Sequence, residues 1–351
     1  MISRLELRNF RNFKEAEVTF SPGVNVICGK NGQGKTNLLE AIHVLGFTKS
    51  MRTNGDREMI KFGEDFFTVK AGGLEIRLSS NGKKTLLKDG AVYPGSKDWL
   101  GLLPVVFFGP QELGIVKNEP GLRRRFMDMA ICQIRPRYTR ALSEYNRAKD
   151  HKSKILKNHR EKPGLLETLP EFNEKMIACG ELLIRERTAF VEKLAELSEK
   201  YHRDISGGGE TLKVSYTADT DLRGTLERVR DREIAAGTCL AGPHRDDIRS
   251  TVNGIDARAF ASQGQAKTAA LAFKLSERDI LREYLGNPVI LLDDVLSELD
   301  ETRRGYILGN MSGGQSIITD CDSSRLRELN AGQTINVSGG CVFSNGEREC
   351  I

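Results

Sequence analysis

The stretch VNVICGKNGQGKTNLLEAI, residues 24–42, decides the fold of this chain. Its apolar, β-branched start at residues 24–28 predicts a buried strand, and residues 36–45 predict a helix. Between them stands Gly29-x-x-x-x-Gly34-Lys35-Thr36, the phosphate-loop pattern, in which glycines let successive backbone N–H groups face a phosphate. A strand before this pattern and a helix after it are the context that it requires. The sequence therefore predicts an α/β fold that grips a phosphorylated ligand.

Each part of this loop has a predicted role. Lys35 would reach the β- and γ-phosphates of a nucleotide, and Thr36 would offer its hydroxyl to Mg²⁺. The helix that follows adds its positive N-terminal end. No base-reading motif of the GTPase kind is evident, so ATP is favoured over GTP. The predicted nucleotide contacts in the loop are Gly29, Lys30, Asn31, Gly32, Gln33, Gly34, Lys35 and Thr36.

A second apolar strand, residues 288–294, ends in two acids, Asp293 and Asp294. Beside a phosphate loop, Asp293 would hold Mg²⁺, usually through water, and Asp294 would orient an attacking water. The alternative is that the two acids cap the next helix, a position that Asp favours. With the loop lysine, they make the predicted catalytic set Lys35, Asp293 and Asp294.

A third motif, Ser262-Gln-Gly264-Gln265, stands at the start of a predicted helix, residues 263–284. A serine and a glycine at a helix N-terminus can hold an anion, although a plain helix cap has the same composition. The order of the motifs along the chain favours the anion site. A phosphate loop comes first, this motif and the acidic strand follow, and Ser297-Glu-Leu-Asp300 comes last.

Length and composition limit the class of protein. A chain of 351 residues, 39% hydrophobic and 29% charged, fits a globular protein of two structural units. No apolar run is long enough to span a membrane, and the N-terminus lacks the apolar core of a signal peptide. The seven cysteines are scattered with no Cys-x-x-Cys pair, which predicts reduced thiols, no zinc site and a cytoplasmic location.

The net charge of +5 conceals a basic block. Residues 121–160 hold twelve Lys or Arg and three Asp or Glu. A one-sided excess of this kind indicates a polyanion partner, whereas the alternative is a solvated helix surface.

The order of apolar patterns along the chain predicts a strand-rich domain with a helical insertion. Residues 66–93 alternate apolar and polar positions between Gly-containing turns, as an antiparallel meander does. An apolar stripe at spacings of three, four and seven predicts a helical hairpin or short coiled coil; it comprises Phe172, Met176, Cys179, Leu183, Phe190, Leu194, Leu197 and Tyr201. The predicted domains are a discontinuous one, residues 1–115 and 205–351, and an inserted helical arm, residues 116–204.

Taken together, the motifs resemble the ABC-type ATPase heads of DNA-maintenance proteins and, within that group, the RecF family. The residues that carry the resemblance span nearly the whole chain in family order. They are LxLxNFRN at 5–12, the phosphate loop, MRT at 51–53, LRRRFxD at 122–128, GPHRDD at 242–247, SQGQ at 262–265 and LLDDVLSELD at 291–300. The implied fold is an ABC-type P-loop ATPase head with a mixed sheet and a meander, plus the inserted arm.

The resemblance implies an ATP-dependent homodimer. In such heads the signature serine, here Ser262 with Gly264 and Gln265, contacts the γ-phosphate held by another subunit, and Asp300 lies at that interface. ATP binding would close the dimer and slow, DNA-stimulated hydrolysis would reopen it, so the chain would be a weak ATPase used as a switch.

The resemblance also implies a role in recombinational repair, replication restart and the SOS response to DNA damage. The dimer would clamp gapped or junction DNA and, with RecO and RecR, help to load recombinase; no membrane partner is expected. The basic block would grip DNA phosphates. The predicted DNA contacts are Arg123, Arg124, Arg135, Arg137, Lys152 and Lys154.

Some positions depart from the broad pattern. Asp294 stands where many heads have Glu, which predicts slow hydrolysis. No histidine follows the strand at 316–319, so Thr319 or Asp320 is the predicted substitute. Gln111 stands where RecF proteins often have an acid, and it joins Thr36 and Asp293 as a predicted metal or water contact. His244 could sense nucleotide or DNA, or be structural.

Two other classes compete with this hypothesis. A transporter-type ATPase subunit normally carries a fuller Leu-Ser-Gly-Gly signature and the switch histidine, and it lacks a basic helical insertion. A small-molecule kinase with the same phosphate loop would leave the 262–265 and 297–300 motifs idle. A DNA-stimulated ATPase activity would distinguish the first hypothesis from both.

Overall fold

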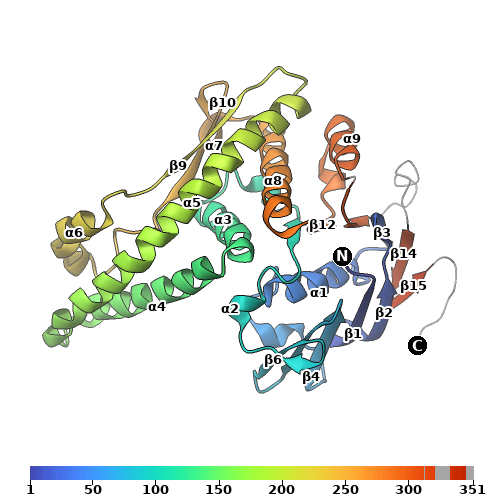
Figure 1. Ribbon diagram of the computed structural model, residues 1–351, viewed down its shortest axis with the longest axis horizontal. Helices are drawn as coiled ribbons and strands as arrows, with labels where there is room; N and C mark the ends of the chain where they lie inside the picture. The colour runs from blue at the N-terminus through green and yellow to red at the C-terminus, as the bar shows by residue number, and fades with distance from the viewer. Residues whose placement is uncertain (312, 321–332, 345–351) are drawn as a thin grey trace. The chain divides into compact units, whose positions relative to one another are not determined.

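The computed structural model describes residues 1–311, 313–320 and 333–344. The chain divides into two compact units, Met1–Leu113 with Glu277–Ile351, and Gly114–Ser276. Figure 1 shows the helices and strands of both units, which are treated separately below.

The first unit contains the phosphate-loop sheet. Its strand order is β15-β14-β3-β13-β12-β8, parallel except for β15 against β14. The strands are β3 Val24–Cys28, β8 Val105–Phe108, β12 Val289–Asp293, β13 Ser316–Asp320, β14 Gln333–Ser338 and β15 Cys341–Ser344. Since β3 and β12 both flank β13, the loop after β3 and the acids at the end of β12 lie at the same edge of the sheet.

The second sheet of this unit is the predicted antiparallel meander. Its order is β2-β1-β4-β5-β6-β7. The strands are β1 Arg4–Phe10, β2 Phe13–Thr19, β4 Phe66–Ala71, β5 Leu74–Ser79, β6 Lys84–Lys88 and β7 Ala91–Val92. The mixed sheet and meander predicted from sequence are confirmed.

Helix α1, Lys35–Phe47, contacts strands of both sheets. This position explains why it is buried on nearly every side, including its polar residues Glu40 and His43. At Gly46 a Cβ would lie 2.8 Å from a Val105 methyl, so the helix approaches β8 more closely than a larger residue would permit. The starting point of α1, and hence the loop before it, is fixed by this packing.

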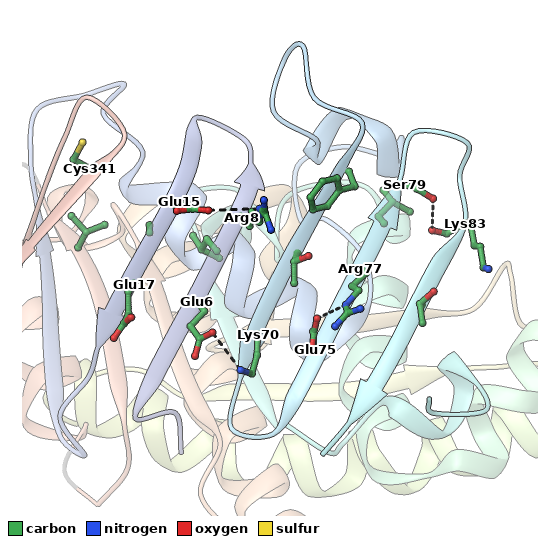
Figure 2. Close-up of a pocket in the computed structure, with 17 residues that line it drawn as sticks. Glu6, Arg8, Glu15, Glu17, Lys70, Glu75, Arg77, Ser79, Lys83 and Cys341 are labelled. Atoms are coloured by element: carbon green, nitrogen blue, oxygen red, sulfur yellow. Dashed lines mark hydrogen bonds and ion pairs between the residues drawn. The ribbon is translucent and has the colours of Figure 1, made fainter. Parts of the chain in front are cut away.

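The outer face of the meander carries a large open cavity of about 930 Å³ (Figure 2). Its charged lining is balanced: Glu6, Glu15, Glu17 and Glu75 against Arg8, Lys70, Arg77 and Lys83. Neighbouring strands pair these charges, as in Lys70–Glu6 at 3.4 Å and Arg8–Glu15 at 3.7 Å. The face is therefore a solvated ladder of ion pairs, with no excess charge that would attract a phosphate.

Long helices dominate the second unit. The main elements are α3 Pro120–Ile134, α4 Pro136–Asn158, α5 Leu169–Ile205, α6 Leu222–Ala236 and α7 Ala257–Phe260, with a three-stranded sheet of β9 Leu212–Thr217, β10 Asp247–Val252 and β11 Ile255–Asp256. Helix α8, Gln263–Leu285, carries the chain on into the first unit. The predicted apolar stripe lies on the single 37-residue helix α5, and Met176, Leu183, Phe190, Leu194 and Tyr201 are buried there.

The short elements complete the described chain. They are η1 Asp56–Met59, α2 Ser96–Trp99, η2 Glu112–Gly114, η3 Pro163–Thr168, η4 Leu296–Glu298 and α9 Glu301–Gly309. The turn η3 separates α4 from α5, whereas α6, β10 and β11 had no sequence signal that we recognised.

Backbone contacts assign residues 205–276 to the second unit, whereas the sequence analysis placed them in the discontinuous domain. The reason is local: β9 packs on α5 and pairs with β10, which in turn contacts α3 and α7. The division into a discontinuous head, residues 1–115 and 205–351, and an inserted arm, residues 116–204, stays a prediction.

Two further expectations concern membranes and thiols. Among the described residues, no helix is both long and apolar enough to cross a membrane. Cys28, Cys132, Cys179 and Cys239 form no disulfide, but Cys341 is disulfide-bonded, so the prediction of an entirely reduced set is wrong at that residue.

Buried ion pairs join the LRRRFxD and GPHRDD motifs in the second unit. Arg123 donates to both carboxylate oxygens of Asp247 at 2.7 and 2.9 Å and also to the carbonyls of Ile115, Val116 and Asn118. Its side chain is 2% exposed. Arg123 is therefore a structural residue, and its assignment to DNA contact is corrected: a basic run in sequence does not reveal that one member turns inward.

A second buried arginine, Arg187 of α5, completes this junction. It pairs with Asp128 at 2.8 Å, lies 3.7 Å from Asp246 and donates to the carbonyl of Pro243 at 2.7 Å. Arg124 donates to the carbonyl of Asp246 at 2.9 Å. Together these contacts hold the GPHRDD segment against α3 and α5.

We expect Arg123→Met to destabilise the protein strongly. Breaking a buried pair costs about 3–5 kcal/mol, and the lower end applies because the Asp247 side chain keeps 21% exposure. Urea unfolding followed by circular dichroism measures the change.

The matched control is Arg137→Met, which removes an exposed charge from α4 and should change the free energy of unfolding by about 0.5 kcal/mol or less. Equal, small effects for both variants would contradict the structural role of Arg123.

Candidate nucleotide-binding site

The phosphate loop joins β3 to α1 through glycines in conformations that other residues rarely adopt. Gly29, Gly32 and Gly34 have φ values of 157°, 79° and 117°. A Cβ at Gly29 would lie 2.3 Å from the carbonyl oxygen of Val337, and one at Gly34 would lie 2.9 Å from the Phe13 ring. Close packing behind the loop therefore requires glycine at both positions.

Lys35 is buried and turned back over the loop. Its Nζ donates to the carbonyl oxygen of Gly29 at 2.7 Å and lies 3.4 Å from Asn31 Oδ1. The N-cap of α1, Gly34, has no side chain that could accept from the first N–H groups of the helix. An ammonium group and uncapped helix N–H groups thus share one loop, which is a donor set that fits the phosphates of a nucleotide.

The loop and the acidic strand meet at one carboxylate oxygen. Thr36 Oγ1 donates to Asp293 Oδ1 at 2.9 Å, and Thr319 Oγ1 donates to the same oxygen at 2.9 Å. Thr319 also accepts the backbone N–H of Asp294 at 3.0 Å. The side chains on β12 and β13 and the first turn of α1 therefore form one connected set.

Asp294 adopts a left-handed backbone conformation with φ 52°. Non-glycine residues in this region are uncommon and concentrate at functional sites. Neither acid caps the helices that follow: η4 has Val295 at its N-cap without a side-chain cap bond, and the cap of α9 is Asp300, which accepts the N–H of Arg303 at 2.9 Å.

The same residues fit a magnesium ion. A threonine hydroxyl and a carboxylate oxygen stand side by side, and Mg²⁺ is usually held by one or two such oxygens together with phosphates and waters. Within the described part of the chain, no group of three or more His, Cys, Asp or Glu could form a separate metal cage. Gln111 is exposed and lies three residues beyond β8, the neighbour of β12. Its metal or water contact stays a prediction.

Residues quoted above only as family markers brace the loop. Arg11 holds the buried carboxylate of Glu40 in α1 with two bonds of 2.8 and 2.6 Å. Asn12 donates to the Gln33 carbonyl at 2.8 Å and accepts from Asn37 at 2.8 Å. These contacts join positions 21 to 29 residues apart in the sequence, so local sequence patterns gave them no role.

The turn between β14 and β15 also touches the loop. The N–H of Gly339 donates to Gln33 Oε1 at 2.5 Å, and a Cβ at Gly340 would lie 2.9 Å from the Asn12 carbonyl oxygen. The loop is thus held from the β1–β2 turn and from a hairpin about 300 residues further along the chain.

The Ser262 motif lies in the second unit and begins α8 with a capping box. Ser262 Oγ accepts the N–H of Gln265 at 3.1 Å, and Gln265 Oε1 accepts the N–H of Ser262 at 2.9 Å. Ser262 therefore caps the N-terminus of α8, as the alternative of a plain helix cap predicted. This cap leaves the exposed Ser262 hydroxyl hydrogen available to a further acceptor.

Glu210 extends this motif into the core of the second unit. It accepts from Gln265 Nε2 at 2.8 Å through one oxygen, and its other oxygen lies 3.1 Å from Nε2 of the buried His202 near the end of α5. Sequence analysis missed Glu210 because it stands in a turn before β9 and its partners lie 8 and 55 residues away.

The predicted DNA contacts separate into exposed and buried groups. Arg137 and Lys154 of α4 are exposed, as is Arg135, which lies 3.7 Å from Glu186. Lys152 is 1% exposed and pairs with the equally buried Glu233 at 2.6 Å. Lys152 is therefore corrected to a structural residue, because burial keeps it from any ligand in solution.

His244 is tied into the core by Tyr145, whose hydroxyl lies 2.6 Å from His244 Nδ1. Burial lowers the pKa of His244 to about 4, so the ring is neutral at physiological pH. The contacts therefore support a structural role for His244 over a role in sensing nucleotide or DNA.

Comparison with known proteins gives consistent matches. The family model described as the RecF/RecN/SMC N terminal domain matches residues 1–96. The DNA replication and repair protein RecF of Agathobacter rectalis is 38% identical over 331 residues, covering 91% of each chain. That of Bacillus cereus is 37% identical and covers 99% of this chain and 100% of its own.

Solved structures agree. A recombination mediator protein RecF with ATPrS, described as part of the RecFOR pathway, superposes with a TM-score of 0.91 at 33% identity and covers 98% of both chains. The Smc head domain of Pyrococcus furiosus superposes with a TM-score of 0.57 at 18% identity, a likeness of fold alone.

We expect Thr319→Val to slow ATP turnover by about ten- to hundredfold, because Asp293 and Asp294 both lose the hydroxyl that positions them. The affinity for ATP should change little, since the loop and Lys35 are untouched. Steady-state hydrolysis and equilibrium nucleotide binding measure the two effects.

Thr319→Ser keeps the hydroxyl and is the matched control, which should retain most of the turnover. If valine and serine variants hydrolyse ATP equally well, Thr319 does not position the acids.

Proposed function

The chain belongs to the RecF family, and we propose that it is an ATP-dependent DNA-binding protein of recombinational repair and replication restart. ATP with Mg²⁺ would bind at the phosphate loop, two chains would close on two nucleotides, and slow hydrolysis would reset the dimer. We propose a cytoplasmic location for this activity.

The observation that carries this proposal is the shared oxygen of Asp293, which Thr36 and Thr319 both approach at 2.9 Å. It couples the loop that would hold the phosphates to the strand that would hold Mg²⁺. The solved RecF structure with ATPrS supports ATP as the ligand, and the donor set around Lys35 fits its phosphates.

The chain's own residues would have distinct tasks in this site. Lys35 would exchange its bond to the Gly29 carbonyl for a phosphate oxygen. Asp294 would orient an attacking water, and its side chain is one methylene shorter than the Glu of many related heads. Bound Mg²⁺ would neutralise the phosphates. Slow turnover suits a switch in which nucleotide binding closes the dimer and hydrolysis reopens it.

The division of motifs between the two units supports the proposed dimer. The phosphate loop belongs to the first unit and the Ser262 capping box to the second. The exposed Ser262 hydroxyl has one hydrogen to donate, and a γ-phosphate on a second copy of the chain would accept it. Anything that binds only the closed dimer stabilises it, so ATP would favour association.

DNA and the mediator proteins complete the proposal. The exposed cations Arg135, Arg137 and Lys154 and the half-buried Arg124 remain the proposed contacts of the helical arm with DNA phosphates. We propose gapped or junction DNA as the substrate and RecO and RecR as partners in recombinase loading, which the RecFOR pathway of the solved relative supports.

The first experiment measures molar mass in solution by light scattering, with and without ATP and Mg²⁺. Asp294→Asn is used to slow hydrolysis. We expect the mass to rise from one chain to two with ATP. Ser262→Arg should abolish this rise, because the arginine side chain is too large for the space that the serine occupies.

The matched control is Ser96→Arg, an exposed serine of α2 that lies outside every motif of the site. A monomer under all conditions that still hydrolyses ATP would overturn the paired-head proposal and favour a small-molecule kinase. Dimerisation without any effect of DNA on hydrolysis would favour a transporter-type subunit.

Glu210 gives a second test of the signature element. Glu210→Ala should weaken the ATP-dependent dimer about tenfold, since hydrogen bonds to charged groups contribute about 1.5–3 kcal/mol. Binding of ATP to the monomer should be unchanged, because the nucleotide is held by the first unit. Sedimentation at several concentrations gives the dimer affinity.

Glu210→Gln keeps an acceptor for Gln265 Nε2 and should restore most of the dimer affinity. If alanine and glutamine variants dimerise alike, Glu210 does not position the signature residues.

A further inference from the structure

A basic pocket in the second unit lies apart from the α4 cations. Its volume is about 420 Å³, and it is built from β10, α7, the end of β9 and the approach to α3. The residues that carry the argument are Arg123, Thr217, Arg245, Asp247, Arg249 and Arg258.

The charges at the base of this pocket are already neutralised. Arg123 is bound to Asp247 through both carboxylate oxygens and to three backbone carbonyls. This pair adds no net charge to the pocket. Whatever charge a ligand meets must therefore come from the other side chains of the lining.

Those other side chains leave a positive excess. Arg245, Arg249 and Arg258 are all exposed. Arg245 donates to the Cys239 carbonyl at 2.9 Å, whereas Arg249 and Arg258 have no ion pair with another residue of the described chain. The remaining acid, Asp256, is engaged as the cap of α7 and accepts the N–H of Ala259 at 2.9 Å.

The strand register explains how these groups converge. Arg249 projects from the same face of β10 as Asp247, and Asp247 lies opposite Thr217 of β9. The hydroxyl of Thr217 thus stands at the pocket wall beside the guanidinium groups. Planar guanidinium groups with an adjacent hydroxyl are the donors that proteins use for phosphate oxygens.

We propose that this pocket binds a backbone phosphate of DNA and forms a second DNA contact, separate from the exposed cations of α4. The proposal rests on the proposed function, which supplies DNA as the polyanion. The volume of the pocket suits a phosphate with the adjoining sugars. Helix α7, which carries Arg258, ends two residues before Ser262. The segment that would hold DNA is therefore continuous in sequence with the signature element.

The test compares DNA binding by fluorescence anisotropy, using a labelled duplex with a single-stranded tail and with ATP and Mg²⁺ present, over a series of salt concentrations. Arg249→Ala/Arg258→Ala should bind about tenfold more weakly at low salt. The slope of log affinity against log salt should become shallower by about 1.8, as expected for two lost phosphate contacts.

The matched control is Arg230→Ala/Arg232→Ala, which removes two exposed arginines from α6 of the same unit. It should keep the wild-type slope. ATP-dependent dimerisation should be unchanged in both variants, which also shows that they fold.

Three outcomes would overturn the proposal. The pocket variant could keep the wild-type affinity and slope, or the α6 control could lose as much as the pocket variant. A loss of ATP affinity with unchanged DNA affinity would assign the pocket to a nucleotide phosphate instead. If the wild-type chain binds no DNA, the proposed function fails as well, whereas in the other cases it stands.

Discussion

The site depends on one interaction, the hydrogen bond from Thr36 to Asp293 across 257 residues of sequence. It forms because β3 and β12 are both neighbours of β13, so their carboxyl ends reach the same edge of the sheet. Thr319 on β13 then stands between the two and bonds to Asp293 and to the N–H of Asp294.

The second unit depends on paired charges. The LRRRFxD and GPHRDD segments read in sequence as a basic run and a mixed run, but in the fold they neutralise each other through Arg123–Asp247, and Arg187 of α5 binds Asp128. A desolvated ion pair contributes little net stability, yet loss of one partner is costly. This constraint explains why Arg123 and Arg187 are buried and paired, and why only the exposed cations are left for the proposed DNA contacts.

Sequence predicted the elements whose signals are local. The strand at 24–28, the helix after the phosphate loop, the meander, the α5 stripe and the acidic strand all follow from short-range periodicity or punctuation, and they are confirmed. Side-chain direction was less accessible. Lys152 and Lys154 are two residues apart on α4, but Lys152 is buried in an ion pair with Glu233 of α6, whereas Lys154 is exposed. Glu210 and the β14–β15 turn were missed because their partners are remote in sequence.

If the chain works as the proposed paired head, its two preformed surfaces explain how slow hydrolysis can still serve a switch. The loop side of the site is complete within one unit, with its lysine, hydroxyl and carboxylate in mutual contact. The Ser262 side is also preformed, since its capping box and Glu210 fix the serine before any ligand arrives. Two preorganised surfaces lose little conformational entropy on meeting, so the free energy of nucleotide binding can go into association. In the proposed dimer, Asp294 would set the lifetime of the closed state, and that lifetime would matter more than the rate of any single turnover.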